Sequence, residues 1–303
     1  MEHETNIDTF ALQMNFEKAV DQRNKLNLLC QWVTIRELGK LEQDKSSKFI
    51  IKYEVFFAGT VIFTIHSGFT RKADSLTGEK GLYYIRIRFA GLKSHKQRQD
   101  EATFNALMTI CAFLNTTRSK FRMVELDLAI DTFCNFDNIL AICVNKSGST
   151  TYNQIGHKQY YKGSIPTTYI EKYRNEQEAN NAVLRAYLYN KSAKEGLYSS
   201  ITRFELKLQN RFFLQYGLSE KSIMEAINRY YVMFFDSIQK KTQYIHILNN
   251  FKSTPKEMEI LGLNRFRLFA NKNVVREFIR LVNSVYVGFH GDIVVPIESN
   301  RRY

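Results

Sequence analysis

The first part of the chain shows two kinds of spacing between its hydrophobic residues. Helical spacing, with apolar side chains three and four positions apart, predicts one or two helices over residues 8–33 and another over residues 99–115. Between them lie runs rich in Ile, Val, Phe and Tyr, which predict strands over residues 48–59, 60–68 and 81–91. Ala58-Gly59 lies between the first two runs, so these two strands are expected to form a hairpin.

The middle of the chain contains three more strand-like segments, at residues 121–131, 182–191 and 200–210. A short helix is expected over residues 136–145 and a short hairpin around residues 150–163. From about Leu218 to Val285 the pattern is helical. It breaks at Ser253-Thr254-Pro255, where the proline fits the first turn of a new helix.

The order of these elements predicts an α+β fold, because strands are grouped together and do not alternate one by one with helices. We expect an antiparallel or mixed curved β-sheet with flanking helices and a helical C-terminal subdomain. The predicted division is an α+β domain over residues 1–216 and a mainly helical subdomain over residues 217–303.

Three of the predicted strands carry an apolar face and a face of charged residues and tyrosines. Side chains alternate between the two sides of a strand, so residues two apart share a face. The polar faces hold Glu125, Asp127 and Asp131 on the first strand, Arg185, Tyr187, Tyr189 and Lys191 on the second, and Arg203, Glu205, Lys207 and Gln209 on the third. If the strands are neighbours, carboxylates, tyrosines and cations gather on one sheet face.

This combination suits the transfer of a DNA strand to a tyrosine. The hydroxyl can attack a phosphodiester and hold the strand as a phosphotyrosine. Carboxylates can bind Mg²⁺ or Mn²⁺, which polarises the phosphate, while Arg and Lys grip the flanking phosphates. The alternative is an ordinary amphipathic sheet, whose solvated charged face is held by pairs of opposite charge across the strands.

The net charge supports a polyanionic partner. The chain has 43 Lys and Arg residues against 30 Asp and Glu residues, a formal charge of +13, and nucleic acid is the natural partner of such a surface. The alternative is that the chain is basic only because an AT-rich genome favours lysine codons, without a role in DNA binding.

Several segments could meet DNA. The stretch 264–278 is basic and helical in pattern, and a helix of this kind could enter a major groove. The candidate DNA-binding residues are Arg265, Arg267, Lys272 and Arg276 in this stretch and Arg86 and Arg88 on the strand at 81–91. A solvated basic surface is the alternative for the same residues.

Other features narrow the class of protein. No apolar run approaches the roughly 18 residues that cross a bilayer, and the polar start MEHETNIDTF is unlike a signal peptide. The four cysteines form no CxxC pair, which disfavours a disulfide framework or a structural zinc site. We therefore expect a cytoplasmic protein without a membrane partner. Neither a P-loop nor an H-x-H pair is present, which disfavours an ATPase and a histidine-based nuclease or relaxase centre.

Three short motifs in order give the sequence a resemblance to a family. They are ELDLAID at 125–131, LRAYLYNKSAKE at 184–195 and TRFELKLQ at 202–209. With them the chain resembles the replication initiation factor family (Rep_trans) of rolling-circle plasmids and phages. The resemblance implies a metal-dependent enzyme that nicks and closes DNA, with residues 1–216 as its catalytic domain and residues 217–303 recognising DNA.

The resemblance also implies residue roles. Tyr189 would be the nicking tyrosine that becomes linked to the 5′ phosphate, and Tyr187, on the same strand face, is the alternative. Arg203 and Lys191 would contact or orient the phosphate.

The metal ligands implied by the resemblance are carboxylates. Asp127 and Glu205 would hold Mg²⁺ or Mn²⁺, with Glu195 as a possible further ligand and Asp131, at the end of its strand, as another candidate. The implied partners are double-stranded origin DNA, a host helicase and polymerase, and a second copy of the chain in a homodimer. Two other functions fit the same features: a sequence-specific DNA-binding initiator or repressor that does not cut, and a mobilisation relaxase.

Overall fold

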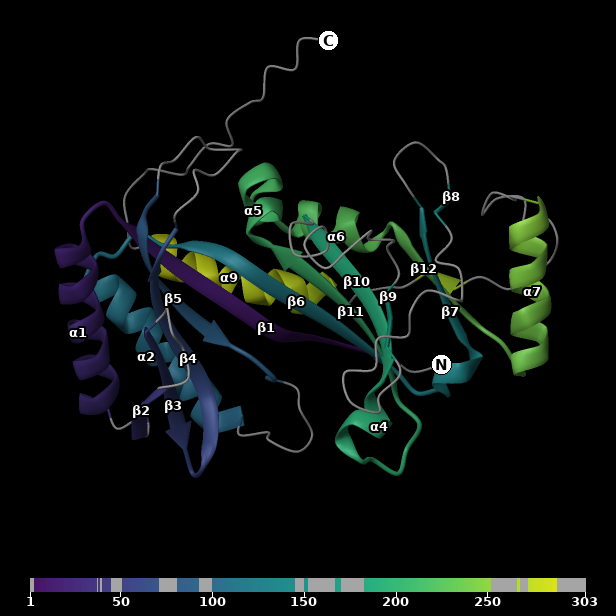
Figure 1. Cartoon of the computed structure of the whole chain (residues 1–303), viewed down its shortest axis with the longest axis horizontal. Helices are drawn as coiled ribbons and strands as arrows, with labels where there is room; N and C mark the ends of the chain where they lie inside the picture. Colours follow the sequence, from purple (N-terminus) through teal and green to yellow (C-terminus); the bar gives the residue numbers. More distant parts are fainter. Residues whose placement is uncertain are drawn as a thin grey trace, which may run out of the picture. The chain divides into compact units, whose positions relative to one another are not determined.

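The chain has an α+β fold, as predicted (Figure 1). The computed structural model describes residues 3–36, 38, 40–44, 51–70, 81–92, 100–144, 150–151, 167–169, 183–251, 266–267 and 272–287. All strand pairs with a described register are antiparallel, and the sheet is open. Most of the hairpin expected around residues 150–163 lies outside the described residues.

The chain divides into two compact units, each built from separate stretches. Unit 1 comprises Met1–Asn6, Asp127–Leu208 and Ser219–Arg276, and unit 2 comprises Ile7–Leu126, Gln209–Leu218 and Glu277–Tyr303. These units differ from the expected continuous ranges 1–216 and 217–303. One reason is the last helix, which returns to the first strand of the chain and packs Phe278 edge-on against Phe10, with 5.2 Å between the ring centroids.

Unit 2 holds strands in the order β2-β3-β4-β5-β1. Their bounds are β1 His3–Phe16, β2 Lys40–Asp44, β3 Ile51–Phe57, β4 Thr60–Phe69 and β5 Tyr83–Phe89. The predicted hairpin is β3–β4, and its turn has both Ala58 (φ 46°) and Gly59 (φ 81°) in the left-handed region, which matches the twist of the flanking strands.

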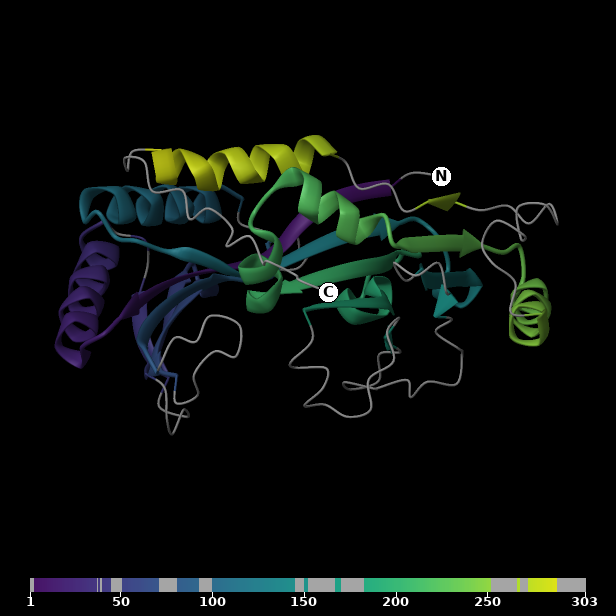
Figure 2. The ribbon, with the colours of Figure 1, turned by 90° about the horizontal axis from the view of Figure 1, so that it is seen from above.

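Helices and stacked aromatic rings form the core of unit 2. The helices are α1 Ala19–Ile35, α2 Asp100–Thr116, α5 Asn210–Tyr216 and α9 Lys272–Val287, the last of which begins in unit 1. Phe89 on β5 stacks on Phe10 at 4.9 Å and on Phe63 at 5.1 Å between ring centroids. Phe278 on α9 packs against Phe10 and so belongs to this cluster. Figure 2 shows α9 and α2 along their length.

The helix predicted over residues 8–33 is wrong in its first half, which is β1. Phe10, Leu12 and Met14 alternate along β1 and pair with Phe89, Ile87 and Ile85 of β5. The intervening residues Thr9, Ala11 and Gln13 are also buried. Phe10, Leu12 and Met14 keep a period of two, but their run is followed closely by the apolar positions of α1, so the two elements together fit one helical pattern.

Unit 1 holds the strand order β6-β11-β10-β9 and a second sheet with the order β13-β12-β7-β8. The strand bounds are β6 Arg122–Thr132, β7 Ile139–Val144, β8 Thr150–Thr151, β9 Thr167–Tyr169, β10 Leu184–Asn190, β11 Thr202–Gln209, β12 Tyr230–Phe234 and β13 Phe266–Arg267. The helices are η1 Phe136–Asn138, α4 Lys191–Glu195, α6 Glu220–Ile227 and α7 Ile238–Phe251. Strands β1 and β6 run through both units.

Two further helix predictions need correction in unit 1. The segment 136–145 is a single 3-10 turn followed by β7, and the supposedly all-helical region after Leu218 contains β12 and β13. Strand β12 pairs with β7 from Phe234 opposite Ile139 to Tyr230 opposite Cys143. Strands β7 and β12 form because they pair with each other. The local spacing of hydrophobic residues does not reveal such a long-range pairing. Among the described residues, no helix is long and apolar enough to cross a membrane.

Candidate active site

Strands β6, β11 and β10 are neighbours in unit 1, as the shared polar faces require. The register of β10 and β11 places Tyr187 opposite Glu205 and Tyr189 opposite Arg203. Directly opposite residues project to the same side of a sheet. The tyrosines, cations and carboxylates of the two central motifs therefore meet on one face.

A carboxylate accepts hydrogen bonds from both tyrosines. The hydroxyl of Tyr187 donates to Oε1 of Glu205, and the hydroxyl of Tyr189 donates to Oε2 of the same residue at 3.1 Å. The two rings stack, with 6.3 Å between their centroids. Glu205 and Tyr189 are buried, whereas Tyr187 is half-buried. Glu205 is placed to take a proton from either phenol.

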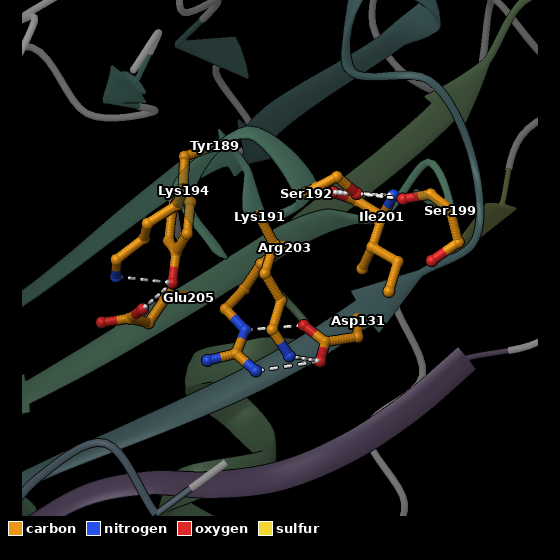
Figure 3. Close-up of polar contacts among 9 residues, drawn as sticks. All are labelled: Asp131, Tyr189, Lys191, Ser192, Lys194, Ser199, Ile201, Arg203 and Glu205. Atoms are coloured by element: carbon orange, nitrogen blue, oxygen red, sulfur yellow. Dashed lines mark hydrogen bonds and ion pairs between the residues drawn. The ribbon is translucent and has the colours of Figure 1, made fainter. Parts of the chain in front are cut away.

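Lys194 lies beside Tyr189 (Figure 3). Its Nζ donates to the Tyr189 hydroxyl at 3.4 Å and lies 4.6 Å from the centroid of the Tyr189 ring. The Tyr189 oxygen thus contacts both a carboxylate and an ammonium group. Sequence reasoning missed Lys194, although Asn190 and Gly196, a helix cap and a helix stop, bracket the short helix that carries it.

Asp131 forms a second, separate cluster with Arg203 and Lys191 (Figure 3). Arg203 donates from Nε to Oδ1 at 2.6 Å and from Nη2 to Oδ2 at 2.9 Å, and Lys191 Nζ donates to Oδ2 at 2.6 Å. All three side chains are at most 3% exposed. Burial acts to raise the pKa of Asp131, but the hydrogen bonds and charges of Arg203 and Lys191 outweigh it and hold the pKa below its ordinary value.

Asp127 lies nearer the tyrosines. Its Oδ2 accepts from Lys207 Nζ at 2.9 Å, and the Asp127 side chain is 3% exposed. Burial raises the pKa of Tyr187 well above its ordinary value, and the negative charges of Glu205 and Asp127 raise it further. Glu205 therefore contacts the Tyr187 hydroxyl, and the negative charge of Asp127 also acts on it.

The predicted metal ligands do not come together as one set. Asp127 and Asp131 share a face of β6 but are four residues apart, about 13 Å along a strand. Both oxygens of Asp131 accept from Arg203 and Lys191. Glu195 is buried on α4. Within the described ranges, no group of three or more His, Cys, Asp or Glu side chains is placed to hold a metal ion.

The predicted DNA-binding residues with described side chains fall in both units. In unit 2, Arg86 donates from Nε and Nη2 to Gln13 at 3.1 and 2.9 Å, and Arg88 pairs with Glu125 at 2.9 Å. Arg276, at the end of unit 1, pairs with Glu220 at 2.9 Å, and Lys272 is exposed.

The remaining two predicted DNA-binding positions have no described side chain. Arg265 lies outside the described residues, and only the backbone of Arg267 is described, in β13.

Comparison with known proteins finds similarity among solved structures. No family model matches the chain, and no curated protein matches its sequence. Among solved structures, the chain is similar to the rolling circle replication initiator protein from Geobacillus stearothermophilus. The identity is 11%, the match covers 78% of this chain and 88% of that chain, and the TM-score is 0.36.

Proposed function

We propose that the protein is a rolling-circle replication initiator, an enzyme that nicks and rejoins one DNA strand at an origin, with Tyr189 as its nucleophile. The observation that carries the proposal is the position of the Tyr189 hydroxyl. It contacts a proton acceptor, Glu205 at 3.1 Å, and a cation, Lys194 at 3.4 Å. An attacking phenol needs both, because it must lose a proton and hold negative charge.

The proposed reaction is a transesterification. Glu205 accepts the Tyr189 proton while the phenolic oxygen forms a bond to the scissile phosphorus. The bond from phosphorus to the 3′ oxygen breaks, and that oxygen takes a proton from water. The products are a 5′-phosphotyrosine and a free 3′-hydroxyl, and the reverse reaction rejoins the strand.

Tyr189 is a better candidate nucleophile than Tyr187. Both hydroxyls donate to Glu205, but the negative charge of Asp127 also acts on Tyr187, and the raised pKa of Tyr187 disfavours the phenolate. Tyr189 has the ammonium group of Lys194 next to its oxygen. In this proposal Tyr187 helps to hold Glu205 in place.

Burial suggests an orienting role for Arg203 and Lys191. Both cations contact Asp131 and are at most 2% exposed, so in this arrangement they fix the ends of β11 and β10. The phosphate contacts then fall to more exposed basic residues.

Mg²⁺ or Mn²⁺ would fit best beside Asp127 and Glu205, the two carboxylates whose charges act on the Tyr187 hydroxyl. Such an ion commonly takes one or two protein carboxylates and completes its shell with phosphate oxygens and water, and when bound it would polarise the scissile phosphate. Asp131 is left out of this set because two buried cations, Arg203 and Lys191, already balance its negative charge.

The proposed partners follow from this function. Double-stranded origin DNA would be bound by basic residues that include Arg86, Arg88, Lys272 and Arg276. A host helicase and polymerase would open and copy the DNA, and the protein would act in the cytoplasm as a homodimer.

A nicking assay tests the proposal. Supercoiled plasmid carrying the coding region and its upstream DNA is incubated with the protein and Mg²⁺ or Mn²⁺, with and without a chelator. We expect metal-dependent nicking and a covalent protein–DNA adduct, both abolished in Tyr189→Phe. Tyr187→Phe is the matched control on the same strand face and should retain the adduct.

Two results would contradict the proposal. Tight, sequence-specific binding without a nick or adduct would favour an initiator or repressor that does not cut. An adduct lost only in Tyr187→Phe would assign the chemistry to the other tyrosine.

A further inference from the structure

We propose that Lys194 is a catalytic residue, the cation that stabilises negative charge on the Tyr189 oxygen both when it attacks DNA and when it leaves. This inference rests on the proposed function and adds to it a residue that touches the reacting atom. Its basis is the position of Nζ, 3.4 Å from the Tyr189 hydroxyl and 4.6 Å from the ring centroid.

The local backbone fixes this position. The chain turns from β10 straight into α4, where the Asn190 side chain caps the helix by accepting from the Ala193 N–H at 2.9 Å. Gly196 ends the helix in the left-handed conformation (φ 65°), which favours glycine. Five residues after Tyr189, this turn brings Lys194 back over the tyrosine.

Hydrogen bonds to the start of β11 also hold α4. The N–H groups of Lys191 and Ser192 donate to the carbonyl of Ile201 at 3.0 and 3.3 Å. The Ser192 hydroxyl accepts from the Ile201 N–H at 2.6 Å and donates to the Ser199 carbonyl (Figure 3). The same two strands therefore carry Tyr189, Glu205 and the support for Lys194.

Exposure separates Lys194 from the other cations of this segment. Lys191 and Arg203 are buried against Asp131, whereas Lys194 is exposed. An exposed ammonium group can keep its contact with the phenolic oxygen and also meet the incoming phosphate. A charge–charge contact of this kind becomes stronger as the phenol loses its proton, which is how a cation lowers a reaction barrier.

In the forward step, the Tyr189 proton passes to Glu205, and the charge that grows on the phenolic oxygen faces Lys194. In the rejoining step, the 3′-hydroxyl gives its proton to water, its oxygen attacks phosphorus, and the bond from phosphorus to Tyr189 breaks. The phenolic oxygen then leaves with negative charge beside the same ammonium group, and it regains a proton from Glu205.

The test compares Lys194→Met, which keeps length without charge, with Lys194→Arg, which restores a cation. Lys221→Met, at an exposed position on α6, controls for the loss of one positive charge from unit 1. Nicking is measured across pH, and ionisation of Tyr189 is followed by NMR of ring-labelled tyrosine without DNA, with Tyr189→Phe assigning the signal. The titratable and charged groups near Tyr189 include Glu205 and Arg203 on β11, Tyr187 on β10 and Lys194 on α4.

We expect Lys194→Met to raise the midpoint of Tyr189 ionisation by about 1 pH unit and to slow nicking about tenfold at neutral pH. The deficit should shrink as the pH rises, because more of the phenol then ionises unaided. Lys194→Arg should recover most of the rate, and Lys221→Met should behave as the wild type.

An unchanged midpoint in Lys194→Met, or a rate loss that is equal at every pH, would overturn the inference and assign Lys194 to DNA binding alone. The NMR measurement separates this failure from failure of the proposed function. A shifted midpoint in a protein that never nicks DNA would support the lysine–phenolate coupling and refute the nicking enzyme.

Discussion

Replacing Asp131 with asparagine should strongly destabilise unit 1. The Asp131 carboxylate accepts three hydrogen bonds of 2.6 to 2.9 Å from Arg203 and Lys191, and all three side chains are at most 3% exposed. Asparagine keeps the shape but removes the negative charge that both buried cations contact. Loss of one partner from a buried ion pair costs about 3–5 kcal/mol, a large part of the roughly 5–15 kcal/mol that stabilises a typical protein.

Urea unfolding, followed by circular dichroism, measures this loss. With a slope of about 2–3 kcal/mol per molar urea, the transition of Asp131→Asn should move down by about 1–2 M. Asp236→Asn is the matched control, because Asp236 also pairs with a lysine at 2.6 Å but its side chain is 85% exposed. The control should unfold close to the wild type.

The pH dependence gives an independent check. The pKa of Asp131 is lower in the folded chain than its ordinary value of 3.8, so the unfolded chain binds this proton more readily. The stabilisation by Asp131 is therefore complete above the unfolded-state pKa and is lost as the pH falls through the folded-state pKa. Asp131→Asn should lack this part of the acid destabilisation. Two results would refute the stabilising role of this ion-pair cluster. One is an Asp131→Asn variant with the same urea midpoint as Asp236→Asn. The other is an Asp131→Asn variant that loses as much stability at low pH as the wild type.

Two further predictions concern the same unit and the thiols. Asn190→Ala removes the cap of α4 and should lower the free energy of unfolding by about 1 kcal/mol in urea titration; an Asn190→Asp variant, which can still cap, should not. Burial raises the thiol pKa to about 11 in three cysteines: Cys30, Cys111 and Cys134. In a Cys143→Ser background, Ellman's reagent at pH 8 should therefore label the folded protein slowly, since only about one thiol in a thousand is ionised, and rapidly once urea unfolds it. Fast labelling of the folded chain would contradict this burial.

The strands that carry the site could be predicted because each has a buried face and a polar face. In β6, for example, Leu126 and Leu128 are fully buried and alternate with the acidic residues. The same alternation placed the tyrosines and Glu205 on a common face, and the register confirms it. Strand β1 escaped prediction because its apolar positions continue into those of α1, and β7 and β12 escaped because each becomes a strand by pairing with the other.

The different contacts of Asp127 and Asp131 could not be predicted from the sequence. Period-two alternation puts Asp127 and Asp131 on the same face and makes them equivalent. Distance along the strand separates them, by about 13 Å over four residues. Asp131 thus lies beside Lys191 and Arg203, near the end of β10, whereas Asp127 lies beside Lys207 and acts on Tyr187.

Burial then explains why neighbouring cations have different roles. Lys191 and Arg203 are buried against Asp131, so their ion pairs join β6 to β11 and to the start of α4. Lys194 lies only three residues after Lys191, but its place on α4 leaves it exposed and in contact with the Tyr189 oxygen. A basic residue in a motif is therefore assigned to structure or to chemistry by what its nitrogen contacts. Of the two lysines in this motif, Lys191 contacts Asp131, whereas Lys194 contacts the Tyr189 oxygen.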